Sequence, residues 1–436
     1  MNQLDVYNGS DLTGHLHNQE DGLVFLYASS WLASPGATPL APGLPLEDLA
    51  FHGDAVNSFF ENLLPEGHVR EFIAKSLQLS PENVFGLLER LGGDTAGAYS
   101  ILPAGTKPGS EAHYLEVSRE AIKEWLTETK GVPLTLHSPD ARMSLSGAQD
   151  KLTVFIDADG KLFLPKGDAP STHIIKPAIS YRQDVPHSAI NEAAIMILAS
   201  RVGLDTAEVR FDRYLNSAVI TRYDRTRPSF GDVSRLHQLD FCQLLDMPSS
   251  KKYESEGGPT FKQCMEVVRT HSSQPAVDIK RLIEWVAFNV IVGNMDSHAK
   301  NLSMLYVGGK ARMSPFYDLV ATLVYPNLSK RFAFKVGGEN RPEWIQGRHW
   351  DRLATETGLR PTYVRKIVTD MASVISHKLP LVMTELTQGN PDVDSVGFLS
   401  KIEQSITRTL RRISVAKEAE EQLARKNIEE PTPGEY

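Results

Sequence analysis

A long apolar run that ends in a cluster of polar residues limits the folds open to this chain. Ile283 to Val292 predicts a helix with a buried side. The residues that follow are Asn294, Asp296, His298, Lys300 and Asn301, and Asp318 arrives later on a Pro-Phe-Tyr-Asp turn. Two carboxylates and an amide at this spacing can hold Mg²⁺ and orient an attacking hydroxyl, as phosphoryl transfer requires. A capped helix followed by a loop with satisfied polar groups is an equally compatible interpretation of this stretch.

The length and charge of the chain set the first limits on function. At 436 residues it is too long for one ordinary core, so two or three domains are expected. Lys and Arg number 46 against 54 Asp and Glu, which gives a net charge of −8. The whole surface is therefore not expected to attract nucleic acid, and any DNA contact would be local or made through a partner.

The cellular compartment is predicted from the absence of targeting and membrane segments in the sequence. Met1 to Asp5 has neither the basic nor the apolar region of a signal peptide. No apolar run reaches the ~18 residues of a membrane span. Cys242 and Cys264 are too few for a disulfide framework or a cysteine-based zinc site. We expect a cytoplasmic protein without membrane contact.

The order of predicted elements divides the chain into three parts. Residues 1–105 read as a mixed α/β unit, residues 106–235 as a sheet with one main helix, and residues 236–436 as mostly helical. This is an α+β organisation with two lobes and a cleft between them.

Two loops have the small residues of a phosphate site. Ser144 to Lys151 lies directly before a predicted strand, and its successive N–H groups can cradle phosphates. It matches neither the dinucleotide-binding nor the Walker A pattern, and a surface turn is equally compatible. Gly92 to Ala98 runs into a strand where a phosphate cradle would need a helix N-terminus, so we interpret it as a tight turn.

Charged residues earlier in the chain are further candidates for nucleotide binding. Lys176 ends an apolar strand, and Glu192 lies early on the next helix, in the order of the lysine–carboxylate pair of kinases. Ala218 to Arg225 is an apolar strand where the lobes would join, a place suited to backbone recognition of adenine. The alternatives are that Lys176 and Glu192 are solvated surface charges and that Ala218 to Arg225 is an edge strand. His298 has no His or Cys at zinc-site spacing, so the oxygen ligands favour Mg²⁺.

Taken together, these motifs resemble the HipA-type toxin kinases. The stretches that carry the resemblance are Ser58–Pro65, Ser144–Lys151, Thr172–Lys176, Asn191–Glu192, Tyr223–Arg225, Pro248–Glu254, Asp296–Asn301 and Pro315–Asp318, which occur in the family's order. The resemblance implies a two-lobed protein-kinase-like fold of the PI3/4-kinase type. The His-Arg-Asp, Asp-Phe-Gly and glycine-rich motifs of ordinary protein kinases are missing from the sequence, so their substrate rules and activation-loop switch do not transfer.

The resemblance also assigns roles by position. It implies that Asp296 is the catalytic base and that Asn301 and Asp318 hold Mg²⁺. The implied ATP-binding residues are Ser146, Gly147, Ala148, Gln149, Asp150, Lys151, Lys176, Thr221, Arg222, Tyr223, His298, Ala299, Lys300, Asn301, Tyr317 and Asp318. Ser144 matches the family's autophosphorylated serine, with Ser146 as a second hydroxyl nearby. A phosphate adds about −1.5 to −2 charge, which is expected to expel the loop and switch the enzyme off.

The implied function is the toxin of a toxin–antitoxin pair, acting as an ATP- and Mg²⁺-dependent serine/threonine protein kinase. Its partners would be a HipB-type antitoxin dimer, operator DNA through that complex, and a protein substrate, which is glutamyl-tRNA synthetase for particular family members. A small-molecule kinase on the same fold and a non-catalytic co-repressor remain alternatives. Local basic candidates for DNA contact are Arg360 and the group Arg408, Arg411 and Arg412, although basic helix faces are usually just solvated.

Overall fold

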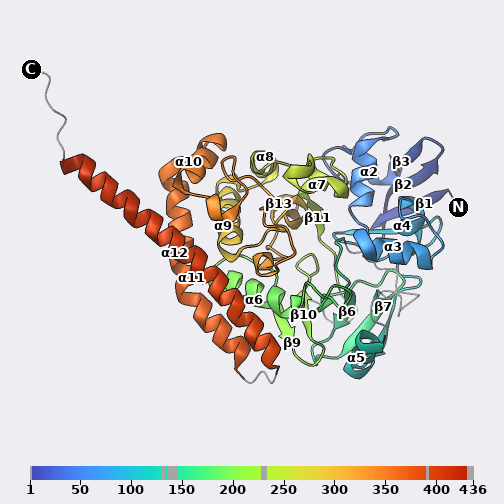
Figure 1. Ribbon diagram of the computed structural model, residues 1–436. Coiled ribbons are helices and arrows are strands. Elements are labelled where there is room, and N and C mark those ends of the chain that lie inside the picture. The colour runs from blue at the N-terminus through green and yellow to red at the C-terminus, as the bar shows by residue number, and fades with distance from the viewer. Residues whose placement is uncertain (1, 129–132, 135–145, 227–232, 389–391, 430–436) are drawn as a thin grey trace, which may run out of the picture.

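The computed structural model describes residues 2–128, 133–134, 146–226, 233–388 and 392–429 (Figure 1). These residues form three antiparallel sheets surrounded by helices. The N-terminal sheet lies at one end of the molecule, and the long helices α11 and α12 lie at the other (Figure 1). The arrangement confirms the predicted α+β class with a mixed N-terminal half and a helix-rich C-terminal half.

The N-terminal sheet has four strands in the order β3-β2-β1-β4. Its strands are β1 (Gln3–Asn8), β2 (Asp11–Gln19), β3 (Gly22–Tyr27) and β4 (Tyr99–Pro103). Gly9 adopts a φ of +60°, the left-handed conformation that an Asn-Gly hairpin turn needs. The helices between β3 and β4 are α1 (Ser29–Leu32), α2 (Asp54–Glu61), α3 (Gly67–Ser76) and α4 (Val84–Leu91). Gly92 to Ala98 turns directly into β4, as the sequence predicted.

The central sheet has six strands in the order β5-β7-β6-β8-β10-β9. The strands are β5 (His113–Val117), β6 (Leu152–Ile156), β7 (Leu162–Lys166), β8 (His173–Pro177), β9 (Val209–Asp212) and β10 (Ser217–Thr221). Helix α5 (Arg119–Glu128) follows β5, and α6 (Ser188–Arg201) connects β8 to β9. Nearly every residue of α6 is buried, so this helix is held between the sheet and the C-terminal helices and can position a side chain firmly.

The C-terminal part is helical with one small sheet. Its helices are α7 (Phe241–Leu244), α8 (Phe261–His271), α9 (Pro275–Val292), α10 (Gly347–Glu356), α11 (Pro361–Thr387) and α12 (Val393–Glu429). The sheet contains β11 (His237–Asp240), β12 (Ser303–Val307) and β13 (Lys310–Met313). The sequence reading did not identify these strands, although Gly308 and Gly309, both at positive φ, form a hairpin turn between β12 and β13.

The apolar run noted first in the sequence is the second half of α9. Its residues from Ile283 to Val292, apart from Glu284, are buried, and Gly293 ends the helix at a φ of +77°. The polar segment that follows therefore starts from a fixed point in the core. Among the described helices, none combines the length and the apolar character that a membrane crossing would need.

Candidate active site

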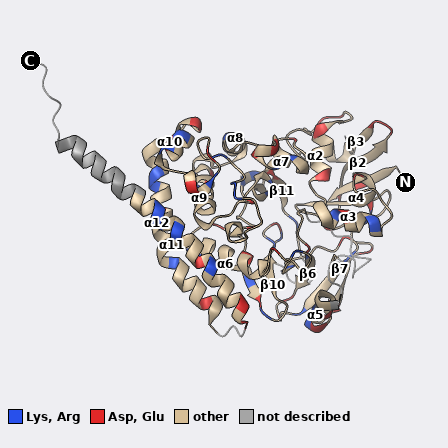
Figure 2. Ribbon diagram, viewed as in Figure 1, with Lys and Arg blue, Asp and Glu red and all other residues tan. Residues whose placement is uncertain are grey.

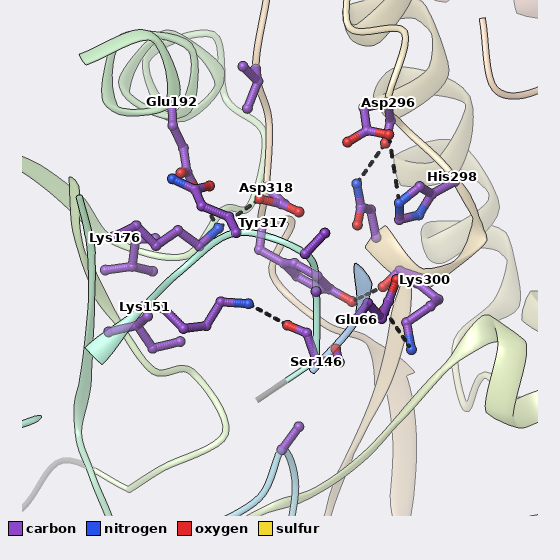
Figure 3. A pocket seen from close by; sticks show the side chains of 18 of the residues that line it. Glu66, Ser146, Lys151, Lys176, Glu192, Asp296, His298, Lys300, Tyr317 and Asp318 are labelled. Carbon is purple, nitrogen blue, oxygen red and sulfur yellow. Dashed lines mark hydrogen bonds and ion pairs between the residues drawn. The ribbon is translucent and has the colours of Figure 1, made fainter. Parts of the chain in front are cut away.

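One cleft gathers nearly all the residues proposed for ATP binding and catalysis (Figure 3). Strands β8 and β10 and the loop 146–151 line one side of it, and the segments 296–301 and 317–318 line the other. The predicted residues that line it are Ser146, Gly147, Ala148, Gln149, Lys151, Lys176, Thr221, Arg222, Tyr223, Asp296, His298, Lys300, Asn301, Tyr317 and Asp318.

Lys176 lines the cleft from the end of β8. Its Nζ lies 2.7 Å from Glu192 Oε1 and 2.7 Å from Asp318 Oδ1. The pair with Glu192, expected from chain order, is present, because buried α6 places that carboxylate beside the strand. Burial disfavours the charged amine, but Asp318 and Glu192 outweigh it and raise the pKa of Lys176 well above its usual range. Lys176 is thus a fixed cation inside the cleft.

Asp318 faces Lys176 from a left-handed backbone position, with a φ of +59°. Asp is among the few residues that tolerate this conformation, and such conformations collect at functional sites. Its side chain remains 35% exposed to the cleft. Although burial opposes ionisation, Lys176 lowers the pKa of Asp318 to about 2, so the carboxylate is charged at neutral pH.

The loop 146–151 places a second cation near Lys176. Lys151 donates a hydrogen bond from Nζ to the carbonyl of Ser146 at 2.5 Å, which folds the loop back on itself. Gly147 has a φ of +109°, a conformation for which glycine is suited. Burial and the nearby charge of Lys176 lower the pKa of Lys151 to about 8. The two lysines repel each other, and an anionic group bound beside them would reduce this repulsion.

Asp296 is the most open of the polar groups, with 53% of its side chain exposed. The hydroxyl of Tyr253 donates a hydrogen bond to Asp296 Oδ1, and His298 Nε2 lies 3.9 Å from the same oxygen. Burial lowers the pKa of His298 to about 4, so this imidazole is neutral near pH 7. An exposed carboxylate flanked by neutral groups can accept a proton from an incoming hydroxyl.

The donor set suits Mg²⁺. Asn301 donates from Nδ2 to the backbone carbonyl of Asp296 at 2.9 Å, which leaves its carboxamide oxygen as the ligand atom. Together with Asp318 this gives two hard oxygen donors, and Mg²⁺ is commonly bound by one or two carboxylates plus substrate phosphates. Within the described residues, no group of three His, Cys, Asp or Glu side chains forms a metal cluster. The residues therefore fit an ion shared with a phosphate ligand.

Several predicted residues have surroundings that the sequence did not indicate. The ammonium of Lys300 is already engaged, 2.5 Å from Asn62 Oδ1, 3.3 Å from Asp240 Oδ2 and 3.4 Å from Glu66 Oε1. It lines the cleft while holding neighbouring segments together. Tyr317 donates a hydrogen bond from its hydroxyl to the Lys300 carbonyl at 2.7 Å, so it supports the same segment.

The guanidinium of Arg222 is held in a buried cluster of charges. Arg222 is 4% exposed and bonds Asp94 at 3.1 Å and Asp224 at 2.7 Å. Arg225 Nη2 also reaches Asp94, at 2.8 Å, and Gly97 donates its N–H to Asp224 at 2.8 Å. Ion pairs with Asp94 of the N-terminal part thus hold the segment around Thr221 and Tyr223 in place.

Asp150 and Ala299 do not line this cleft. Asp150 accepts the N–H of Leu134 at 3.0 Å and borders a neighbouring cavity, and burial raises its pKa to about 6. Ala299 is buried, with its N–H directed to the carbonyl of Lys252 at 3.3 Å. Ser144 lies outside the described residues.

The basic candidates for DNA contact lie elsewhere. Arg360 is the exposed residue before α11, and the basic group Arg408, Arg411 and Arg412 is exposed on α12. Figure 2 shows both basic and acidic positions on α11 and on the coloured part of α12.

The cleft residues that the sequence did not predict include Asn62, Glu66, Asp240 and Lys252, and Tyr253 lies beside Asp296. The stretches Ser58–Pro65 and Pro248–Glu254 had been noted only as family resemblance. Their place in the site depends on tertiary contacts between segments nearly 190 residues apart, such as Lys252 with Glu66, and no local spacing indicates these.

Comparisons with known proteins agree with the geometry. The family model for the HipA-like C-terminal domain matches residues 143–379, and the model for the HipA N-terminal domain matches residues 4–102. In Sinorhizobium fredii, the protein named "Putative kinase Y4mE" is 37% identical over 393 residues, covering 88% of this chain and 92% of that protein. The serine/threonine-protein kinase toxin HipA of Shewanella oneidensis is 28% identical over 408 residues and 90% of each chain.

A solved structure shows the same fold. A chain in the Shewanella oneidensis complex of HipA, HipB and operator DNA superposes with a TM-score of 0.81 and 25% identity, covering 95% of this chain and 99% of that one. The two-lobed, kinase-like fold expected from the sequence is confirmed. The chain belongs to the HipA family.

Proposed function

We propose that this HipA-family chain is an ATP- and Mg²⁺-dependent serine/threonine protein kinase that serves as the toxin of a toxin–antitoxin pair. The observation that carries the proposal is the convergence of Lys176, Lys151, Asp318 and Asp296 in one cleft. Two cations, a metal-binding carboxylate and an exposed base are the parts that phosphoryl transfer requires.

Nucleotide binding follows from the charges of the cleft. Lys176, held by Glu192, and Lys151 of the loop would contact the phosphates of ATP. Successive N–H groups of residues 146–151 would add hydrogen bonds to those oxygens. The adenine would lie against Thr221 to Tyr223, where the backbone supplies its partners because the Arg222 guanidinium is held by Asp94 and Asp224.

Transfer itself depends on the opposite wall. Asn301 and Asp318 would hold Mg²⁺, whose charge would stabilise the negative charge that develops on the phosphates. Asp296 would accept the proton of the attacking hydroxyl, and its exposure lets a protein substrate approach. Asn301 fixes the backbone of Asp296 and thereby the position of the base. His298 stays neutral and lines the phosphate site.

Regulation by autophosphorylation at Ser144 is part of the proposal. A phosphate just before the loop 146–151 would compete with ATP for Lys151 and repel the nucleotide phosphates. A Ser144→Asp variant is therefore expected to bind ATP more weakly than a Ser144→Ala variant. Equal ATP affinities, measured by titration calorimetry, would contradict this mechanism.

The partners are proposed from the relatives' names. A HipB-type antitoxin would neutralise the kinase, and the complex would bind operator DNA, with sequence reading done by the antitoxin. Arg360 and the basic group on α12 are the candidates for direct phosphate contact. Their replacement should reduce the salt dependence of DNA binding by the assembled complex. Glutamyl-tRNA synthetase, which the family resemblance implies for particular members, is the first protein substrate to test.

One experiment separates this function from its alternatives. The protein is incubated with γ-labelled ATP and Mg²⁺ and compared with Asp296→Asn and with Asp21→Asn, an exposed control in the β2–β3 turn. Label on protein in the wild type and the control, but not in Asp296→Asn, supports a protein kinase. Label only on a small acceptor indicates a small-molecule kinase, and no label with tight antitoxin binding indicates a non-catalytic co-repressor.

A further inference from the structure

A short segment of the N-terminal part enters the active-site cleft between its two loops. After α2 ends, Asn62 and Glu66 both line the cleft. Pro65 pairs with Gly147 in a parallel bridge, and Glu66 donates its backbone N–H to the Gly147 carbonyl at 3.1 Å. This segment therefore touches the phosphate-binding loop, residues 146–151, directly.

The side chain of Glu66 points to the other loop. Its Oε2 lies 2.6 Å from Lys252 Nζ, and its Oε1 lies 3.4 Å from Lys300 Nζ. Glu66 is only 8% exposed, and burying a carboxylate is costly unless cations compensate it. Oε1 has no hydrogen-bond partner among the described residues, so its interaction with Lys300 is an ion pair without a close hydrogen bond.

Both lysines lie within the machinery that positions the base and the metal ligands. Lys252 accepts the N–H of Ala299 on its carbonyl at 3.3 Å, and its neighbour Tyr253 bonds Asp296. Lys300 belongs to the catalytic loop, residues 296–301, and accepts the hydroxyl of Tyr317, which precedes Asp318. The Glu66 carboxylate thus contacts Lys252, whose neighbour bonds Asp296, and Lys300, whose carbonyl accepts a hydrogen bond from the residue before Asp318.

We propose, on the basis of the proposed function, that Glu66 is a positioning residue that couples the phosphate-binding loop to the catalytic loop. The coupling runs from the Glu66 N–H on Gly147 to the Glu66 carboxylate on Lys252 and Lys300. When nucleotide orders the first loop, the same residue fixes the second loop in the arrangement needed for transfer. The N-terminal part of the chain therefore contributes directly to the catalytic step.

The variant Glu66→Gln tests this relation cleanly. It keeps the backbone bond to Gly147 and the size of the side chain, but removes the charge that Lys252 and Lys300 share. Glu71→Gln, an exposed position on the helix that follows, is the matched control. Loss of a hydrogen bond between charged groups is expected to lower kcat about 10- to 100-fold. The ATP dissociation constant should change less than about threefold, because the variant keeps Lys176 and the phosphate-binding loop.

A double variant with Lys252→Gln adds a second criterion. If Glu66 acts through this lysine, the two substitutions together should reduce kcat by less than the product of their separate effects. A kcat for Glu66→Gln within about twofold of the control, or independent effects in the double variant, would overturn the proposal.

Hydrogen exchange measures the coupling without relying on turnover. A non-hydrolysable ATP analogue should slow amide exchange in both loops of the wild type, but only in residues 146–151 of Glu66→Gln. Equal protection of residues 296–301 in both proteins would refute the coupling. If the wild type transfers no phosphate while the analogue still protects both loops, the proposed kinase function fails and the coupling stands. If the analogue protects neither loop, both fail.

Discussion

Lys176 Nζ lies 2.7 Å from Asp318 Oδ1, so the lysine proposed for ATP phosphates and the carboxylate proposed for Mg²⁺ satisfy each other. On the proposed function, ATP with Mg²⁺ would exchange this ion pair for two new contacts. Both side chains are already charged and held in the cleft, which would limit the reorganisation that binding requires.

The first prediction concerns Asp318→Asn. This change removes the metal-binding charge and frees Lys176 from one carboxylate. We expect Mg²⁺ to strengthen ATP binding by about tenfold or more in the wild type and to have little effect in the variant, since even outer-shell changes cost metal sites 10- to 100-fold. Titration with ATP in the presence of Mg²⁺ or of EDTA measures this. An unchanged Mg²⁺ effect would exclude Asp318 as a ligand.

The second prediction concerns Glu192→Gln. The carboxylate of Glu192 is buried and holds Lys176 from α6, so its loss leaves the ammonium with Asp318 alone. The free energy of unfolding should fall by about 2 kcal/mol, typical of a hydrogen bond between charged groups. Transfer should slow as well, because Lys176 moves toward Asp318. Urea unfolding and single-turnover rates test both effects, with exposed Glu208→Gln as the control.

The third prediction concerns Tyr253→Phe. The Tyr253 hydroxyl donates a hydrogen bond to Asp296 Oδ1. This hydrogen bond holds the proposed base in position for an incoming hydroxyl. The variant is expected to lower kcat with the protein acceptor by about 3- to 10-fold, the value of one hydrogen bond, with the KM for ATP unchanged. A lower acceptor KM with kcat unchanged would indicate instead that Tyr253 competes with the acceptor hydroxyl for Asp296.

The fourth prediction is a pH dependence at Asp150. Burial raises the pKa of this carboxyl to about 6 from 3.8, so the folded state favours its protonated form. Its contribution to stability is complete below pH 3.8 and is lost as the pH rises through 6. Asp150→Asn should be more stable than the wild type by about 1 to 2 kcal/mol at pH 8, after allowance for partial exposure.

The measurement for Asp150 is urea unfolding of both proteins at pH 8 and at pH 3. The difference should nearly vanish at pH 3, below the ordinary pKa of 3.8, where the wild-type carboxyl is mostly protonated in both states. A difference of equal size at both pH values would assign the effect to packing and not to charge. ATP affinity should be little affected, since Asp150 faces the cavity beside Leu134.

The sequence predicted the parts of the site that local pattern encodes. The apolar run of α9, the polar segment after it and the strand that ends at Lys176 follow from periodicity and position, and the structure brings their side chains together. The sequence did not predict the direction in which individual side chains point. Arg222 and Asp150 belong to predicted ligand segments, yet one faces a buried ion cluster and the other a second cavity, because strand twist and loop path decide orientation.

The ion pairs between the N-terminal part and the catalytic segment were not predicted from the sequence. Glu66 and Lys300 are separated by more than half of the chain, and neither has a local signature of an ion pair. The β12–β13 hairpin was overlooked because its strands are short and lie in a helix-rich region. Such features depend on how the lobes dock, which is determined by the shape of the packed interface.

The buried ion cluster behind the adenine segment has a consequence for how the protein unfolds. Asp94 comes from the N-terminal part, and its arginine partners, Arg222 and Arg225, come from the middle of the chain. If the N-terminal sheet detached, Asp94 would lose its arginine partners, and Arg222 and Arg225 would keep Asp224 as their remaining carboxylate, at a cost of several kcal/mol. Local opening of that sheet is therefore disfavoured by this charge cost in addition to the loss of packing. The molecule is expected to melt in a single cooperative transition, with no intermediate that keeps the kinase lobes folded without the N-terminal part.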